Sequence, residues 1–314
     1  MLKKGAFYIF FGLIFLLLNC QKEESIKRCC LAENVVVIVV DGPRYSETWG
    51  DPSHEFIPHM KTDLAPHGVV FTNFRNNGST YTNAGHSAIL SGHYQDINNI
   101  GGEVPQRPNF LQYWLRKSGA PQTKAWLFAS KDKIEPLANC QDSLWADQFL
   151  PSTDCGNNGL GSGYRADSIT VKHVLDTMGK YEPNIVLINL REPDFSGHTG
   201  VWEDYLASIK QVDKDYYAIW QFIRTNPNYK DKTALFITND HGRHLDSVGS
   251  FSSHGDGCEG CRHINLFAYG PDFKTNEINT DVYELTDIST TVGAIFRMKV
   301  PTSDGQIIKD LFKK

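Results

Sequence analysis

The stretch NVVVIVVDG at residues 34–42 decides the fold, because a run of β-branched residues leads directly into Asp41. Such a run is typical of a strand buried on both faces, and it leaves the carboxylate at the end of that strand. Three other segments end in similar side chains, namely YTNAGH at 81–86, NIVLINLREPDFSGH at 184–198 and TALFITNDHG at 233–242. Carboxylates and imidazoles from separate strand ends are what hard and borderline metal ions require. The sequence therefore predicts a metal site.

Strand-like segments alternate with helical ones from Asn34 onward, which predicts an α/β/α sandwich with a central, mostly parallel sheet. The clearest helix is 202–224, where apolar residues recur at helical spacing. In such a sheet functional groups gather at the carboxyl ends of the strands. Residues 136–165, which are rich in Gly, Asn, Ser and Asp, predict a surface insertion near the site. The expected strands are 35–40, 69–74, 125–128, 185–190, 234–238 and 264–269.

The composition is that of a globular protein and gives no argument for nucleic-acid binding. The chain has 314 residues, a hydrophobic content of 40% and a formal net charge of −5. That charge offers no basic surface for nucleic acid. An anionic substrate stays open, because bound cations dominate a local field. We expect one catalytic domain over residues 34–314.

The N-terminal residues 1–20 resemble a bacterial lipoprotein signal. Lys3 and Lys4 precede an apolar stretch that is short for a membrane span, and the stretch ends at Cys20 before the polar QKEES. Asn19 departs from the usual small residue before the cysteine, and a plain secretory signal or an uncleaved anchor are the alternatives. Each version predicts export, to the periplasm or the cell surface. A lipid on Cys20 would anchor the domain to the membrane through a tether over residues 21–33.

The remaining cysteines suggest disulfides, because their number is even and the chain is predicted to be exported. Cys140 with Cys155 and Cys258 with Cys261 are the candidate pairs. The rival for CEGC at 258–261 is a zinc site, although an oxidising compartment favours the disulfide. Cys29 and Cys30 have no assigned role. The six residues are Cys29, Cys30, Cys140, Cys155, Cys258 and Cys261.

Five motifs in a fixed order resemble the alkaline phosphatase superfamily, and most closely its nucleotide pyrophosphatase/phosphodiesterase type. The resemblance runs from about Asn34 to the C-terminus and includes ELTDISTTVGAIFRMKVP at 284–301, which is similar to the last helix of that family. It implies an alkaline phosphatase-like fold and a metal-dependent phosphoesterase. The motifs are Asp41 after the hydrophobic strand, Thr82 four residues before His86, Asp194-x-x-x-His198, Asp240-His241 and the later His254.

The resemblance implies two divalent metal ions, usually zinc, that lie close together. Singly, each ligand has a plainer interpretation, because an aspartate after a strand often caps a helix and a histidine often lies on the surface. His263 is the alternative to His254, and His86 would support the turn after the nucleophile. Carried over by position, one ion takes Asp194, His198 and His254, and the other takes Asp41, Asp240 and His241 with the Thr82 oxygen between them.

The resemblance also implies that Thr82 attacks phosphorus and that water hydrolyses the phosphothreonine formed. Asn83 either donates a hydrogen bond to the phosphoryl group or only shapes the turn. The phosphate-binding asparagine of the phosphodiesterases has no clean match, although Asn98 and Asn99 lie near its place. Sulfatases of the superfamily need a C/S-x-P-x-R signature, which this chain lacks.

The sequence thus predicts an exported hydrolase that cleaves phosphate monoesters or diesters of small molecules. Three alternatives stay open: a transferase that moves a phospho-group to an acceptor hydroxyl, a sulfate- or phosphonate-cleaving relative with the same metals, and a surface lipoprotein that only binds. The natural substrate and the oligomeric state do not follow from the sequence.

Overall fold

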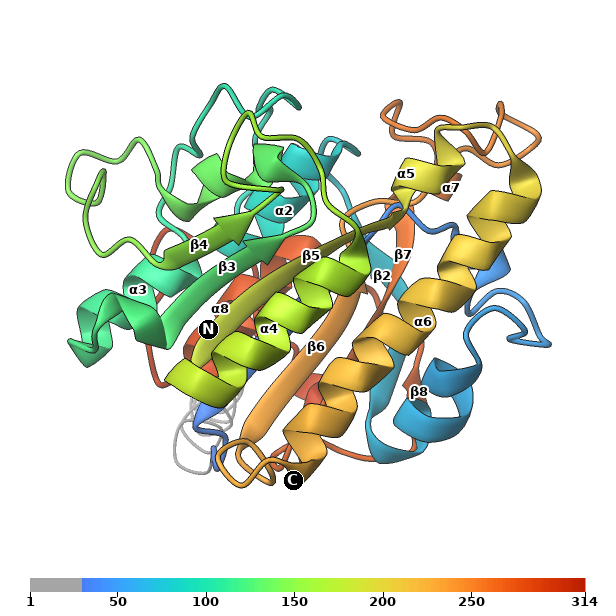
Figure 1. Cartoon of the computed structure of the whole chain (residues 1–314). Coiled ribbons are helices and arrows are strands. Elements are labelled where there is room, and N and C mark those ends of the chain that lie inside the picture. The colour runs from blue at the N-terminus through green and yellow to red at the C-terminus, as the bar shows by residue number, and fades with distance from the viewer. Residues whose placement is uncertain (1–29, 314) are drawn as a thin grey trace, which may run out of the picture.

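The computed structural model describes residues 30–313 (Figure 1). The predicted signal, Cys20 and most of the tether lie outside these residues. Within them, no helix is both long enough and apolar enough to cross a membrane.

A single mixed sheet forms the centre of the molecule, with strand order β4-β3-β5-β1-β6-β7-β2-β8 and β9 paired to β2. The strands from β4 to β6 in this order are parallel to their neighbours, whereas β7 is antiparallel to both β6 and β2. The predicted fold class is therefore confirmed. The strands are β1 (Asn34–Asp41), β2 (Val69–Arg75), β3 (Ala125–Ala129), β4 (Ser152–Cys155), β5 (Ile185–Pro193), β6 (Thr233–Asn239), β7 (His263–Tyr269), β8 (Glu277–Asn279) and β9 (Tyr283–Glu284).

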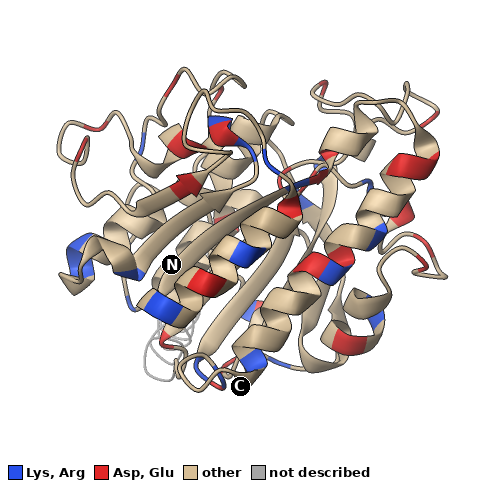
Figure 2. Ribbon diagram, in the orientation of Figure 1, with Lys and Arg blue, Asp and Glu red and all other residues tan. Residues whose placement is uncertain are grey.

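Helices cover both faces of the sheet, with α4 and α6 on one side and α2, α3 and α8 on the other (Figure 1). Charged residues recur along α4 and α6, whereas the central strands are almost free of them along their length (Figure 2). The α-helices are α2 (Thr82–Ser91), α3 (Phe110–Ser118), α4 (Asp167–Tyr181), α5 (Asp194–Gly197), α6 (Trp202–Thr225), α7 (Glu259–Arg262) and α8 (Leu285–Ile295).

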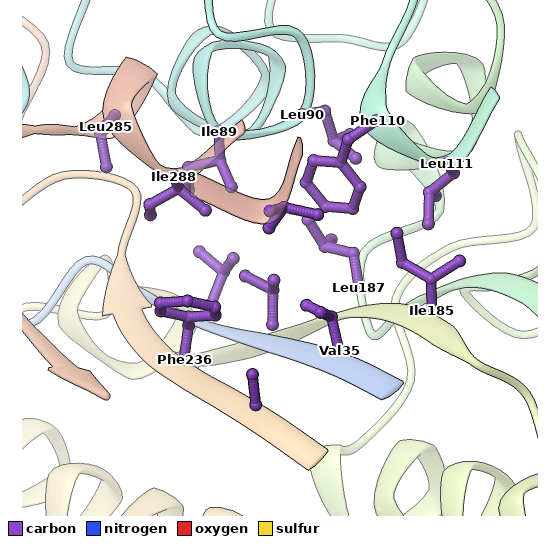
Figure 3. Packing of buried hydrophobic residues seen from close by; sticks show 14 of the residues in the cluster. Val35, Ile89, Leu90, Phe110, Leu111, Ile185, Leu187, Phe236, Leu285 and Ile288 are labelled. Atoms are coloured by element: carbon purple, nitrogen blue, oxygen red, sulfur yellow. The ribbon is translucent and has the colours of Figure 1, made fainter. Parts of the chain in front are cut away.

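Strand β1 explains how the two layers form, because its successive side chains point to opposite faces. Val35 and Val37 pack with Ile288 and the other side chains beneath α2, α3 and α8, as Figure 3 shows for Val35 and Ile288. Val36 and Ile38 belong to the opposite cluster, under α4 and α6. Each fully buried side chain of this kind contributes about 1.5–3 kcal/mol. A strand buried on both faces needs the continuous β-branched run that the sequence shows.

The register of β1 brings its end beside the ends of two neighbours. Val40 pairs with Leu190 of β5 and with Asn239 of β6. The residues that follow these strands therefore meet at one edge of the sheet, as predicted. The six expected strands and the helix over 202–224 are present with shifts of at most a few residues.

Two regions differ from the sequence-based expectation. The segment 136–165 contains β4, which pairs with β3 and buries Cys155, so part of the expected insertion is an edge strand of the sheet. Its sequence STDC carries no apolar alternation, which is why it does not stand out as a strand. The closing helix α8 ends at Ile295, well before residue 301. Neither Cys140 nor Cys155 is disulfide-bonded.

Candidate active site

The predicted carboxylates meet at one edge of the sheet. Asp41 is the last residue of β1, Asp194 follows β5 as the first residue of α5, and Asp240 follows β6. All three are buried, with at most 3% of the residue exposed. Three buried acids so close together repel one another, so the site requires positive charge.

The first group of ligands, which we name the sheet-end cluster, comprises Asp41, Thr82, Asp240 and His241. The ligand atoms of Asp41, Asp240 and His241 lie within 4.8 Å of one another. His241 Nε2 lies 3.5 Å from Asp41 Oδ1 and 3.5 Å from Asp240 Oδ2. Thr82 Oγ1 lies 3.5 Å from Asp41 Oδ1. Asp240 Oδ2 and His241 Nε2 are buried and have no hydrogen-bond partner. Such orphaned atoms are costly unless a ligand satisfies them.

The second group, the loop cluster, comprises Asp194, His198 and His254. Asp194 Oδ1 lies 3.3 Å from the Nε2 atom of each histidine, and the two Nε2 atoms lie 3.2 Å apart. The histidine side chains differ in burial, because His198 is 50% exposed and His254 only 5%. His263, the alternative to His254, lies away from this cluster, stacked on Tyr45 and bonded through Nε2 to the Thr72 carbonyl.

Both clusters fit a divalent metal ion. A tetrahedral zinc with bonds of about 2.0–2.1 Å has ligand atoms about 3.3 Å apart, close to the separations in each cluster. Carboxylate and imidazole donors also suit zinc and related ions. The orphaned atoms Asp240 Oδ2 and His241 Nε2 supply an independent sign of a missing partner. Together the two clusters provide the ligand sets expected from the sequence.

Thr82 stands at the start of α2, where the positive end of the helix dipole favours negative charge. The helix approaches the sheet closely at Gly85, where an added Cβ would lie 2.6 Å from the Asp240 carbonyl oxygen. His86 donates from Nδ1 to the Thr82 carbonyl at 2.8 Å, and Asn189 donates to His86 Nε2 at 3.1 Å. The Thr82 hydroxyl is thus held by a rigid element beside the ligand atoms.

Lys131, which the sequence analysis did not single out, lies between the two clusters. Its Nζ is 2.8 Å from Asp41 Oδ2 and 2.6 Å from Asp194 Oδ2, and it donates to Thr82 Oγ1 at 3.3 Å. The ammonium therefore takes the second oxygen of each carboxylate and leaves both Oδ1 atoms facing the clusters. Lys131 follows the end of β3, at the same edge of the sheet as the aspartates. Its place after a strand was therefore a signal in the sequence.

Arg243 is a second cation absent from the sequence-based prediction. It donates from Nη1 to Asp194 Oδ1 and from Nη2 to the Ser252 carbonyl at 2.9 Å, and its side chain is fully buried. Gly197 leaves room for it, because a Cβ there would lie 2.8 Å from the guanidinium carbon. Arg243 thus ties the segment that carries His254 to helix α5. In the sequence, Arg243 directly follows Asp240-His241-Gly242, and this closeness to two predicted ligands could have indicated a role at the site.

Burial and nearby charges shift the pKa of Asp41 and of Asp194 in opposite directions. Burial, and then the Asp240 charge, raise the pKa of Asp41 to about 7. Burial acts in the same direction on Asp194, but Lys131 and nearby groups outweigh it and hold its pKa well below the ordinary value. Burial lowers the pKa of His241 to about 3, so this imidazole is neutral and free to bind a metal.

Asn83 does not take the substrate-binding position considered for it. Its side-chain amide donates to the carbonyl oxygens of Asn98 and Lys133 at 3.2 and 3.1 Å, and the residue is fully buried. Both amide hydrogens are thereby used, so Asn83 shapes the surrounding loops. Asn99, named in the sequence analysis without a role, accepts from the Asn83 backbone N–H and lines the cavity.

A cavity of about 310 Å³ opens over these groups. It combines cationic, metal-ligand and aromatic side chains, a mixture suited to an anionic group attached to an organic one. Burial lowers the pKa of Lys133 in its wall to about 8. The lining residues are Thr82, Asn99, Lys131, Lys133, Tyr164, Asp194, Phe195, His198, Thr199 and His254.

Comparison with known proteins finds a family whose sequence profile matches part of this chain. The sequence profile of the Metalloenzyme superfamily matches residues 162–300, which include five of the seven expected ligands. The resemblance to the alkaline phosphatase superfamily is confirmed. Over 76 residues the chain is 33% identical to the 2,3-bisphosphoglycerate-independent phosphoglycerate mutase of Natronomonas pharaonis, a match that spans 24% of this chain and 14% of the mutase.

Solved structures resemble this chain over most of its length. Murine ectonucleotide pyrophosphatase/phosphodiesterase 5 has a TM-score of 0.66 and 16% identity, covering 89% of this chain and 100% of that one. An inactive threonine-to-alanine variant of the murine protein, in complex with AMP, gives a TM-score of 0.65 at 15% identity, with coverage of 90% and 100%. A phosphonate monoester hydrolase from Silicibacter pomeroyi gives 0.65 and 15%, covering 88% of this chain and 76% of that one. At such identities the likeness shows the fold alone.

Proposed function

We propose that the chain is an exported, metal-dependent hydrolase that cleaves phosphate esters of small molecules, with Thr82 as the nucleophile. The observation that carries this proposal is the pair of three-residue ligand sets beside the Thr82 hydroxyl. In the sheet-end cluster Thr82 Oγ1 lies 3.5 Å from Asp41 Oδ1. Thr82 also shares one cavity with all three residues of the loop cluster. A binding protein has no need for a hydroxyl in that position.

The sheet-end and loop clusters would each hold one divalent ion, for which zinc is our proposal. When bound, the ions supply positive charge that lowers the pKa of the Thr82 hydroxyl and neutralises the phosphoryl oxygens. Thr82 Oγ1 would form a bond to phosphorus while the bond to the ester oxygen breaks, and the Thr82 proton would end on that oxygen, which leaves as an alcohol. Water would then attack the phosphothreonine, restore the Thr82 hydroxyl and release the phosphoryl group as phosphate or a phosphate monoester.

The chain's own residues orient the substrate around this reaction. The positive end of the α2 dipole and the Lys131 ammonium offer charge to the phosphoryl oxygens. Tyr164 and Phe195 present aromatic surfaces in the same cavity, and both are partly exposed. They suit an organic leaving group with a flat, apolar face.

The experiment is a substrate screen of the soluble fragment 21–314, purified without chelator and supplied with zinc or manganese. Nitrophenyl phosphate, bis-nitrophenyl phosphate and nitrophenyl sulfate are offered at equal concentration. We expect turnover of one or both phosphate esters and little of the sulfate. Absence of phosphoester turnover with either metal would contradict the proposal.

A phosphonate-cleaving enzyme with the same metals is the second candidate. The Lys131 ammonium, 3.3 Å from the Thr82 hydroxyl, would serve a phosphonate as well as a phosphate ester. The fold is also shared with the phosphonate monoester hydrolase described above. Adding nitrophenyl phenylphosphonate to the screen separates the candidates, since this proposal requires the phosphonate to be the faster substrate.

Export and lipid anchoring form a separate part of the proposal, which rests on residues 1–20. The full-length protein should incorporate labelled fatty acid in a bacterial host and sediment with membranes. Cys20→Ala should remove the label. Unlabelled full-length protein in the cytoplasmic fraction would refute this part and leave the catalytic proposal intact.

A further inference from the structure

A second group of potential metal ligands lies outside the active site, in the segment between β6 and β7. His244, Asp256, Cys258 and Cys261 each direct one nitrogen, oxygen or sulfur atom to a common point, and these four atoms lie within 4.8 Å of one another. Cys261 is fully buried and His244 is largely covered, whereas Asp256 reaches solvent. None of these residues belongs to the sheet-end or the loop cluster.

The separations match a tetrahedral site of mixed ligands. Cys258 Sγ and Cys261 Sγ are 3.5 Å apart, Cys261 Sγ is 3.6 Å from Asp256 Oδ1, and His244 Nε2 is 3.1 Å from the same oxygen. With bonds of about 2.3 Å to sulfur and about 2.1 Å to nitrogen or oxygen, zinc would separate two sulfurs by about 3.8 Å and a nitrogen from an oxygen by about 3.4 Å.

An independent observation at His244 points to an absent partner. Its Nε2 atom is buried and makes no hydrogen bond, although Asp256 Oδ1 lies 3.1 Å away. Asp256 Oδ1 already accepts the backbone N–H of Cys258 at 3.0 Å. A metal ion would satisfy the free lone pair of the imidazole.

We infer that this segment binds one structural zinc ion, or another thiophilic divalent ion, through His244 Nε2, Asp256 Oδ1, Cys258 Sγ and Cys261 Sγ. Four protein ligands fill a tetrahedral shell, which is typical of a structural site and leaves no position for substrate. The two cysteines are not disulfide-bonded here, and their 3.5 Å separation far exceeds the bond length of about 2.05 Å. The zinc interpretation of CEGC therefore replaces the disulfide that the sequence favoured.

The position of this ion would stabilise the segment that carries His254. His254, a ligand of the loop cluster, lies two residues before Asp256 in the segment 242–262. The segment begins beside the active site, where the Gly242 N–H donates to the Cys261 carbonyl at 2.8 Å. An ion that joins His244 to residues 256–261 closes this irregular segment and restricts the positions open to His254.

Cobalt substitution tests the inference, because among the three ligand groups found in residues 30–313 this group alone contains cysteines. Cobalt-loaded fragment 21–314 should show a thiolate-to-cobalt charge-transfer band in the near-ultraviolet. Cys258→Ser/Cys261→Ser should lose the band and one equivalent of bound metal. Asp41→Asn, which alters the sheet-end cluster, should keep the band and serves as the matched control. A wild-type spectrum without the band, or an unchanged band in the double variant, would overturn the inference.

Thiol trapping on the wild-type protein decides the question even if the double variant fails to fold. The protein is denatured with chelator but without reductant, and a maleimide is added. Alkylation of Cys258 and Cys261 under these conditions, together with their protection in the native metal-loaded protein, is the expected result. Alkylation that requires a reductant would establish a disulfide and refute the zinc site. Native thiols that react equally fast with and without chelator would also refute it.

Discussion

The sheet-end cluster and the loop cluster carry similar ligands but are built in different ways. Asp41 and Asp240 stand at the ends of adjacent parallel strands, and His241 beside them is fully buried. In the loop cluster His198 is half exposed, and His254 comes from the long segment between β6 and β7. The strands fix the sheet-end ligands during folding, whereas the half-exposed His198 of the loop cluster loses side-chain freedom when an ion binds.

Charge reinforces this difference. Lys131 and Arg243 both donate to Asp194, whose pKa is held low by its cationic surroundings, chiefly Lys131. The pKa of Asp41 is instead raised to about 7 by burial and by Asp240. The sheet-end cluster therefore has only the Lys131 ammonium, which it shares with Asp194, while the loop cluster also has Arg243. We expect the sheet-end cluster to bind its ion more tightly.

The largest expected effect concerns the nucleophile of the sheet-end cluster. Thr82→Ala should reduce kcat by several powers of ten and leave the metal content unchanged, because three ligands remain in each cluster. Thr82→Ser keeps the oxygen and should retain substantial activity. Steady-state kinetics and elemental analysis of the same samples provide the measurement. Full activity of the alanine variant would show that the hydroxyl does not attack, and a phosphorylated Thr82 peptide trapped at low pH would show that it does.

Lys131 tests whether charge between the clusters matters. Lys131→Met leaves Asp41 and Asp194 without their shared cation, and loss of one partner of a buried pair costs about 3–5 kcal/mol. Metal-free variant protein should therefore unfold at a lower denaturant concentration than metal-free wild type. Saturating zinc should restore most of the difference, because the ions replace the missing charge. The same loss with and without zinc would indicate a packing defect instead.

His254 and His263 form a matched pair for the loop cluster. His254→Ala should lose about one equivalent of metal and at least about a hundredfold in kcat, since ligand loss exceeds the effect of outer-shell changes. His263→Ala removes a histidine bonded to Thr72, away from the cluster, and should keep both metal content and turnover. Metal analysis and kinetics on both variants settle the assignment. Loss of metal in the His263 variant alone would reverse it.

The smallest effect is a difference in the order of metal loss. During stepwise chelation the loop ion should leave first, followed by the sheet-end ion. Cys258→Ser/Cys261→Ser protein is used, so that a third ion does not complicate the count. The number of metal ions retained at each chelator concentration is measured for this protein and for the same protein with His254→Ala, which lacks the loop ion. Simultaneous release of both ions would contradict the proposed difference in affinity.

The sequence was sufficient for the sheet because its central strands have clear patterns. The β-branched run of β1 and the acids after β1, β5 and β6 allowed both the fold and the ligand groups to be predicted. Strand β4 could not be found, since STDC has no apolar pattern and depends on pairing with β3. The long segment that carries His254 has no periodicity, so the choice of His254 over His263 depended on the family resemblance alone.

The sequence-based prediction of the site also omitted two charged side chains that lie outside the family motifs. Lys131 and Arg243 are fully or almost fully buried, and burial of a lysine or arginine depends on tertiary contacts with Asp194 and Asp41. For Asn83, the two roles considered were a substrate contact and shaping of the turn. Its place beside Thr82 suggested substrate contact, but its amide is used to fix two neighbouring loops.

The most direct test of the central claim is anomalous diffraction from crystals of the zinc-loaded fragment 21–314, measured on both sides of the zinc absorption edge. The account predicts two separate peaks over the cavity that contains Thr82. One should lie among Asp41, Asp240 and His241, and the other among Asp194, His198 and His254. No peak at either cluster, with Asp41 and Asp194 paired only with Lys131 and Arg243, would contradict it.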